Sequence, residues 1–135
     1  MTIVAPDVSE VIILKLLVNH PDISQEDLEL HLYKANVDPT DNTVIGDLTE
    51  ATEAGYSSIT LTGASWTVST SSGISTAEYA EQTFTITEAA TYYGYYVTQT
   101  SSGGLVWCER FDATSGFILP SGGGTIAMRP KVTLD

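Results

Sequence analysis

Short segments in which apolar and polar residues alternate make up most of this chain, and turn residues separate them. Alternation with a period of two is the pattern of a β-strand that buries one face. In one such segment Leu28, Leu30 and Leu32 fall on one face and polar residues on the other. Pro130 interrupts the last segment and indicates an edge position or a bulge, because proline cannot donate to a strand ladder. The pattern predicts strands at 28–33, 44–48, 57–61, 65–69, 82–87 and 125–134, with a turn at 38–42 and a polar loop at 70–76.

The run at 10–18 differs from the others because it is apolar almost throughout, with Lys15 as its main interruption. A strand that is covered on both faces has such a pattern, and we predict one here. A short helix is the alternative, since leucine and lysine favour helices. The run stops at Asn19-His20-Pro21, well short of the length that spans a membrane.

The most informative stretch is a predicted β-hairpin at 92–111. Two runs of aromatic and β-branched residues flank the turn Thr100-Ser101-Ser102-Gly103-Gly104, whose glycines can adopt positive φ. Alternation places Tyr93 and Tyr95 on one face of the first strand, and Tyr92 and Tyr96 on the other. Tyrosines on both faces cannot all belong to one sandwich core. We therefore expect one set to meet solvent, a neighbouring subunit or a ligand.

These segments amount to eight or nine strands without a long amphipathic helix, which predicts an all-β fold. We predict a single antiparallel β-sandwich over residues 1–135, of jelly-roll type or with another Greek-key order. No internal repeat or linker divides the chain. Within this domain, residues 1–9 are a candidate for an extended N-terminal arm.

The charge balance argues against nucleic acid as a partner. Seventeen acidic residues face five basic ones, giving a formal net charge of −12. Binding to a phosphate backbone needs clustered lysine and arginine, and here these residues are scattered. Residues 1–53 carry eleven acids against Lys15 and Lys34, a balance of −9. This acidic part could dock on a basic partner, although solubility is the more ordinary reason for such a charge.

Targeting signals and disulfides are not expected. The first residues lack the basic and apolar regions of a secretory signal, and no apolar run reaches the length of a membrane span. Cys108 is the only cysteine, so an internal disulfide is excluded. These features predict a protein without a membrane partner, made in a reducing cytoplasm.

Motifs for catalysis or cofactor binding do not emerge from the sequence. Gly122-Gly123-Gly124 is not followed by a helix that could hold a phosphate. His20 and His31 stand eleven residues apart without a paired cysteine, which does not make a zinc site. The turn at 38–42 has too few oxygen ligands for a calcium loop, and Cys108 has the surroundings of a core residue rather than a nucleophile. We predict no enzymatic activity, no cofactor and no metal.

Several blocks of the chain resemble small β-sandwich decoration (cement) proteins of tailed-bacteriophage capsids. These blocks cover much of the chain and are structural rather than catalytic; they are PDVSEVIILK at 6–15, YSSITLTGASW at 56–66, YGYYVT at 93–98 and LVWCERF at 105–111. The resemblance implies a non-enzymatic virion protein on the outside of an icosahedral head. It also implies a homotrimer bound between capsomers, with the major capsid protein as partner. Such a protein would be made in the cytoplasm of the host bacterium.

On this hypothesis, two parts of the chain are candidates for the interfaces. The N-terminal segment at 1–18, or the acidic turns near it, would contact the shell, and the tyrosine-rich hairpin would contact sister subunits. The candidate interface residues are Ile3, Val4, Pro6, Asp7, Tyr92, Tyr93, Tyr95 and Tyr96.

A second hypothesis comes from another class, a carbohydrate- or receptor-binding module of a phage tail appendage. Tyrosine and tryptophan side chains would then act as stacking platforms beside Asp, Asn or Gln in an exposed groove. A small hydrolase is a third class, which would require a pocket of convergent titratable groups, and the sequence does not supply one.

Overall fold

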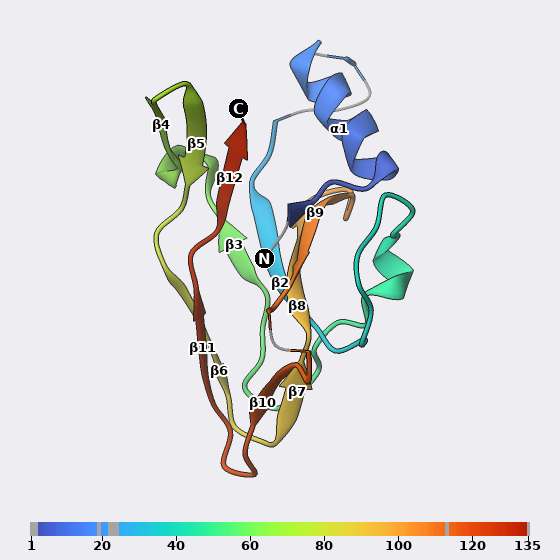
Figure 1. Ribbon diagram of the computed structural model, residues 1–135, viewed down its shortest axis with the longest axis vertical. Helices are drawn as coiled ribbons and strands as arrows, with labels where there is room; N and C mark the ends of the chain where they lie inside the picture. Colours follow the sequence, from blue (N-terminus) through green and yellow to red (C-terminus); the bar gives the residue numbers. More distant parts are fainter. Residues whose placement is uncertain (1–2, 19, 22–24, 113, 135) are drawn as a thin grey trace.

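Figure 1 shows the computed structural model, which describes residues 3–18, 20–21, 25–112 and 114–134. Within them the chain forms twelve strands, one α-helix and two short 3₁₀-helices, so the predicted all-β class is confirmed. The helix is α1 (Asp7–Leu17), and the strands are β1 (Ile3–Val4), β2 (Leu28–Tyr33), β3 (Ile59–Leu61), β4 (Thr67–Ser71), β5 (Ile74–Glu78), β6 (Gln82–Ile86), β7 (Ala90–Tyr92), β8 (Gly94–Gln99), β9 (Leu105–Arg110), β10 (Phe117–Leu119), β11 (Gly124–Met128) and β12 (Lys131–Leu134).

All strand pairs between these elements are antiparallel. The largest sheet has the order β1-β9-β8-β2-β3, and a three-stranded sheet has the order β12-β5-β4. Two further pairs are β11-β6 and β10-β7. In Figure 1, β4, β5, β12, β6 and β11 run along one side of the five-stranded sheet. These pairings do not establish the predicted jelly-roll order.

One hydrophobic cluster joins the five-stranded sheet to the strands beside it. Leu30 of β2 and Val97 of β8 belong to this cluster, together with Phe84 and Ile86 of β6 and Ile126 of β11. The alternation that was predicted for 82–87 is confirmed, because Phe84 and Ile86 are buried and the threonines between and beside them are exposed. Burial of this apolar area is the main source of stability in the fold.

A second cluster covers the opposite face of the same sheet. Tyr33, Tyr96 and Cys108 lie in it, and the segment 34–52, drawn in teal in Figure 1, closes it with Leu48 and Val37. The central strand β8 is therefore covered on both faces, and all six of its residues are buried. The predicted hairpin is confirmed as β8 and β9, with Gly103 at positive φ in the turn.

The strand that we predicted at 10–18 is wrong, and the helical alternative is correct. Pro6 precedes α1, and its carbonyl accepts hydrogen bonds from the backbone N–H groups of Ser9 and Glu10. Acidic residues in the first turn and Lys15 in the last turn favour the helix dipole. The continuous apolar run is ambiguous between strand and helix because helix α1 is apolar around most of its circumference.

The expectation of an extended arm at residues 1–9 is also wrong for the part that the structure describes. Ile3 and Val4 form β1, which pairs with Glu109 and Cys108 at the edge of the five-stranded sheet. Pro6 is buried, and α1 begins at the next residue. A strand pair and a helix thus replace the arm.

Three other segments differ from their predicted forms. Residues 44–48 form a 3₁₀-helix at Ile45–Asp47 instead of a strand, since the Asp47 carboxylate accepts the Val44 N–H at 3.0 Å. The polar loop at 70–76 is a tight hairpin between β4 and β5, with positive φ at Ser72 and Gly73 as a type I′ turn requires. Pro130 separates β11 from β12. Because the predicted strand at 125–134 is divided in this way and further short strands are present, the described residues form twelve strands instead of the predicted eight or nine.

None of the helices in the described part of the chain is long and apolar enough to cross a membrane.

Candidate functional site

Most of the tyrosines in the predicted interface are core residues. Tyr92, Tyr95 and Tyr96 are at most 4% exposed, and Tyr93 is half-buried. The expectation that one set of them faces a solvent, subunit or ligand surface is therefore wrong for these three residues. Two features explain this result. The sheet is covered on both faces. In addition, the regular strand is interrupted at Tyr93, between β7 and β8, so the side chains of Tyr92 and Tyr95 lie in the same hydrophobic cluster.

The hydroxyls of two buried tyrosines of the predicted interface donate hydrogen bonds to carboxylates. Tyr92 donates to Glu53 at 3.0 Å, and Tyr95 donates to Glu109 in a short hydrogen bond. Burial, followed by the bonded carboxylate, raises the pKa of both hydroxyls well above the ordinary value for tyrosine. These hydroxyls therefore remain protonated throughout the neutral range.

The four predicted N-terminal interface residues differ in their exposure. Asp7 is exposed at the start of α1, Ile3 and Val4 are half-buried in β1, and Pro6 is buried. Of these four residues, only Asp7 is freely open to a partner.

An exposed apolar face lies on α1 instead, and residue-by-residue analysis of the sequence missed it. Ser9 is buried and donates its hydroxyl to the Leu105 carbonyl at 2.7 Å, which fixes the inner side of the helix on β9. The outer side carries Val8, Val11, Leu14 and Val18, of which Leu14 is 60% and Val18 68% exposed. Their spacing of three or four residues puts them on one side of the helix and its C-terminal cap. We call these four residues the outer face of α1.

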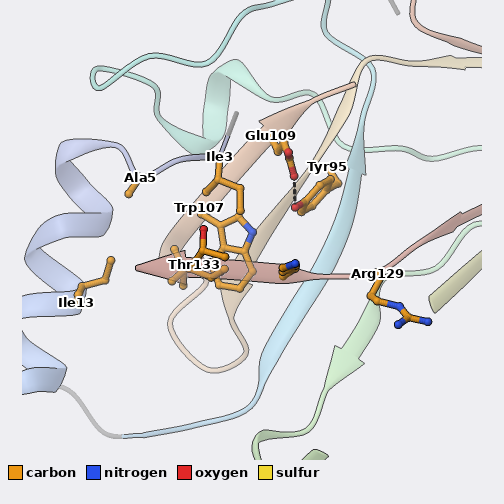
Figure 2. A pocket seen from close by; sticks show the side chains of 11 residues that line it. Ile3, Ala5, Ile13, Tyr95, Trp107, Glu109, Arg129 and Thr133 are labelled. Carbon is orange, nitrogen blue, oxygen red and sulfur yellow. Dashed lines mark hydrogen bonds between the residues drawn. The ribbon is translucent and has the colours of Figure 1, made fainter. Parts of the chain in front are cut away.

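A cavity of about 710 Å³ opens between β9 and β12, beside α1. Figure 2 shows its lining side chains: Ile3 and Ile13 stand on one side, Trp107 lies across the centre, and Arg129 stands at the far side. An adjoining cavity of about 350 Å³ is lined by seven apolar residues, Ile13, Leu28, Trp66, Ala77, Val106, Trp107 and Val132. The two sheets thus do not close on one another at this end of the molecule.

Polar groups gather at one end of the larger cavity. Glu109 and Tyr95 meet there through their hydrogen bond, and Figure 2 shows the indole nitrogen of Trp107 on the side of its ring toward them. The Trp107 N–H is directed toward the Tyr95 hydroxyl, but the two groups do not reach the geometry of a hydrogen bond. Trp107 is only 7% exposed, so this donor is buried without a partner.

Thr98 of β8, His31 of β2 and Glu50 are linked in the order of a catalytic triad, but the threonine and the histidine are buried. His31 Nε2 lies 3.0 Å from the Thr98 hydroxyl, and His31 Nδ1 lies 2.8 Å from a Glu50 carboxylate oxygen. Tyr96 stacks on the His31 ring at 4.6 Å. Thr98 is 3% and His31 8% exposed, so the hydroxyl and the imidazole lie inside the folded protein. We assign this network to the stability of the sheet.

Cys108 is fully buried, and we expect its thiol to be inert in the folded protein. Burial raises the pKa of this thiol to about 11. At pH 8 the thiolate fraction should fall about a hundredfold below that of an ordinary cysteine, and burial adds a steric barrier. A chromogenic aromatic disulfide should therefore react at least about a hundredfold more slowly with the native protein than with the protein in urea. Equal rates in the two conditions would contradict the buried position.

Metal-ligand groups do not converge in the part of the chain that the structure describes: no three His, Cys, Asp or Glu residues there could together hold a metal ion. The outer face of α1 and the cavity beside Trp107 are thus the two candidate functional surfaces. Comparisons of the chain with protein-family models, with curated proteins and with solved structures give no match.

Proposed function

We propose that this protein is a non-enzymatic structural protein of a phage virion that decorates the outer surface of the head. The major capsid protein is the proposed partner, and the protein would act as a homotrimer. The resemblance of its sequence blocks to decoration proteins suggests this function, and the outer face of α1 carries the argument from the structure. Large exposed apolar patches on a folded domain mark sites of protein contact.

The helix supports this proposal through its composition. A helix that is apolar on all sides is normally buried, yet Val11 is 52% and Leu14 60% exposed on the outer side of α1. Burial of one such side chain against a partner contributes about 1.5–3 kcal/mol. The outer face lies in the N-terminal segment that the sequence analysis assigned to the shell. It replaces Ile3, Val4 and Pro6 as the proposed contact surface.

The paired substitution Val11→Asp/Leu14→Asp tests this proposal. Loss of two buried apolar side chains, together with two new charges, should weaken capsid binding by about a hundredfold or more. The measurement is co-sedimentation of the purified protein with empty phage capsids, alongside its solution mass by light scattering. Both positions are more than half exposed, so the melting temperature should change little.

A matched control is Ile118→Asp, because Ile118 is 66% exposed on β10, at the opposite end of the molecule from α1. This variant should bind capsids like the parent protein. If the α1 variant binds as well as the control, the outer face is not the capsid contact. If the α1 variant loses its trimer but not capsid binding, the face joins sister subunits instead. Deletion of residues 1–8 is a poorer test, since it removes β1 from the edge of the sheet.

A further inference from the structure

The cavity beside Trp107 is unrelated to the outer face of α1 and carries a separate inference. Protein sites for small ligands are concave, have volumes of about 300–1,000 Å³, and combine apolar walls with a few convergent polar groups. The cavity of about 710 Å³ between β9 and β12 has this composition. We propose that it binds a neutral ring that bears hydroxyl groups, namely one pyranose unit of a carbohydrate.

The apolar wall suits the C–H face of such a ring. Ala77 pairs with Val68 on one side and with Val132 on the other, so the three side chains form a row across the three-stranded sheet. Ala77 and Trp66 line the adjoining apolar cavity of about 350 Å³, and Val132 and Trp107 line both cavities. The two indole rings pack edge to face, 6.2 Å apart, which holds the aromatic side of the cavity in a fixed position.

The polar end requires a ligand group that both donates and accepts hydrogen bonds. The Trp107 N–H is a buried donor without an acceptor, and indole can only donate. Glu109 offers carboxylate oxygens a short distance along the same wall and is 7% exposed. A hydroxyl group accepts from an N–H and donates to a carboxylate at the same time. A sugar ring presents several hydroxyl groups along its edge.

The charges around the cavity are of both signs, which is compatible with a neutral ligand. Glu109 lies among the lining residues and would repel an anion, whereas Arg129 and Lys131 line the same cavity and would repel a cation. Arg129 is already paired with Glu78 at 3.0 Å. A neutral ring is repelled neither by the Glu109 carboxylate nor by the two basic side chains.

The test is a titration of ¹⁵N-labelled protein with the methyl α-pyranosides of glucose, galactose and mannose, observed by NMR at the indole N–H resonances. At least one of them should give a saturable shift of the Trp107 N–H signal. Its dissociation constant should be on the order of 1 mM, as is typical of a ligand with so few atoms. Trp107→Phe assigns the signal.

Two variants with matched controls locate the site. Glu109→Gln keeps an acceptor for the Tyr95 hydroxyl and should weaken binding about tenfold, through loss of a charge-assisted hydrogen bond. Glu78→Gln, outside the cavity, should not. Ala77→Phe should fill the adjoining apolar cavity, where the C–H face of the ring would lie, and abolish binding, whereas Val68→Phe, in the same row but 73% exposed, should not. Melting curves confirm that each variant is folded.

Two results would overturn the proposal. One is the absence of any shift with all three pyranosides. The other is a shift of the Trp107 signal with cyclohexanol or an anilinonaphthalene sulfonate but with no pyranoside, which would make the cavity a site for apolar ligands. Capsid binding by the Glu109→Gln variant should equal that of the parent protein. A negative result in the pyranoside titration therefore leaves the proposed capsid function untouched, and the reverse also holds.

Discussion

Gly94→Ala is expected to lower the stability of this protein by about 4–5 kcal/mol. Gly94 pairs with Tyr33 of β2 on one side and with Arg110 of β9 on the other, at the start of β8, the middle strand of the five-stranded sheet. A β-carbon at this position would lie 2.5 Å from Cε1 of the Tyr33 ring, and closer still to the carbonyl oxygen of Glu109. The Tyr33 ring is fully buried and the carbonyl belongs to a strand, so neither can move aside without breaking the sheet.

The expected cost follows from this overlap. Overpacking of a core typically costs about 1–3 kcal/mol, and overlap with backbone atoms costs more, about 4–5 kcal/mol. A domain with a net stability of about 5–15 kcal/mol then loses a large part of it. The measurements are the soluble yield and thermal denaturation followed by circular dichroism.

The control for Gly94 is Gly122→Ala. Gly122 lies in the turn before β11, and a β-carbon added there would meet no heavy atom within 4 Å. Its φ is not positive, so alanine can adopt the same backbone conformation, and the melting temperature should stay the same or rise slightly. If both variants melt like the parent protein, the packing of Tyr33 on Gly94 is not as tight as the structure indicates.

Local patterns in the sequence were sufficient to predict β6 and the hairpin of β8 and β9. Phe84 and Ile86 alternate with threonines, and the hairpin around Gly103 has both the turn residues and the flanking β-branched and aromatic residues. Such features depend on neighbours in the sequence. The class of the fold follows from them. The order of the strands does not, because it depends on contacts between distant segments.

The fate of the tyrosines could not be predicted for this reason. Whether Tyr96 faces solvent or a core depends on the segment 34–52, which lies on the outer side of the sheet through Leu48 and Val37. The pattern of that segment predicts a turn at 38–42 and a strand at 44–48, and neither indicates that the segment covers the sheet. The sequence pattern of β8 alone is compatible with either outcome.

The two candidate surfaces differ in how far the sequence could have revealed them. The outer face of α1 follows from helical spacing once the run is recognised as a helix, since Val11, Leu14 and Val18 then fall on one side. The cavity combines Tyr95, Trp107 and Glu109 with Val132, which is distant in the sequence. Only the approach of β12 to β9 brings these residues together.

Arg110→Met is expected to lower the stability by about 2–4 kcal/mol, mainly by releasing the segment 34–52. The guanidinium donates to the Val37 carbonyl and to the Asn36 side chain, each at 2.7 Å, and its Nε lies 3.0 Å from an Asp38 oxygen. It also lies over the Tyr93 ring, 5.2 Å from the centroid. Hydrogen bonds from a charged group contribute about 1.5–3 kcal/mol each. The Asp38 pair adds little because the Asp38 side chain is 86% exposed.

Arg129→Met provides the matched comparison, since it removes the same charge from a site with one exposed ion pair. The Arg129 side chain is 57% exposed and pairs with Glu78, so its loss should change the stability by no more than about 0.5 kcal/mol. Thermal melts should separate the two variants by roughly 10 °C. Equal melting temperatures would show that Arg110 does not hold the segment 34–52 in place.

Reactivity of Cys108 gives an independent measure of the same release. Cys108 lies in the cluster that the segment 34–52 covers, Val37 of that segment packs against this cluster, and Arg110 donates to the Val37 carbonyl. If Arg110→Met opens this segment, the Cys108 thiol becomes accessible under native conditions, because local opening controls the exposure of a buried group. The thiol should then react with an aromatic disulfide markedly faster in Arg110→Met than in Arg129→Met. A lower melting temperature without a faster thiol reaction would show that Arg110 stabilises the whole fold. The segment 34–52 would then stay closed until the sheet itself unfolds.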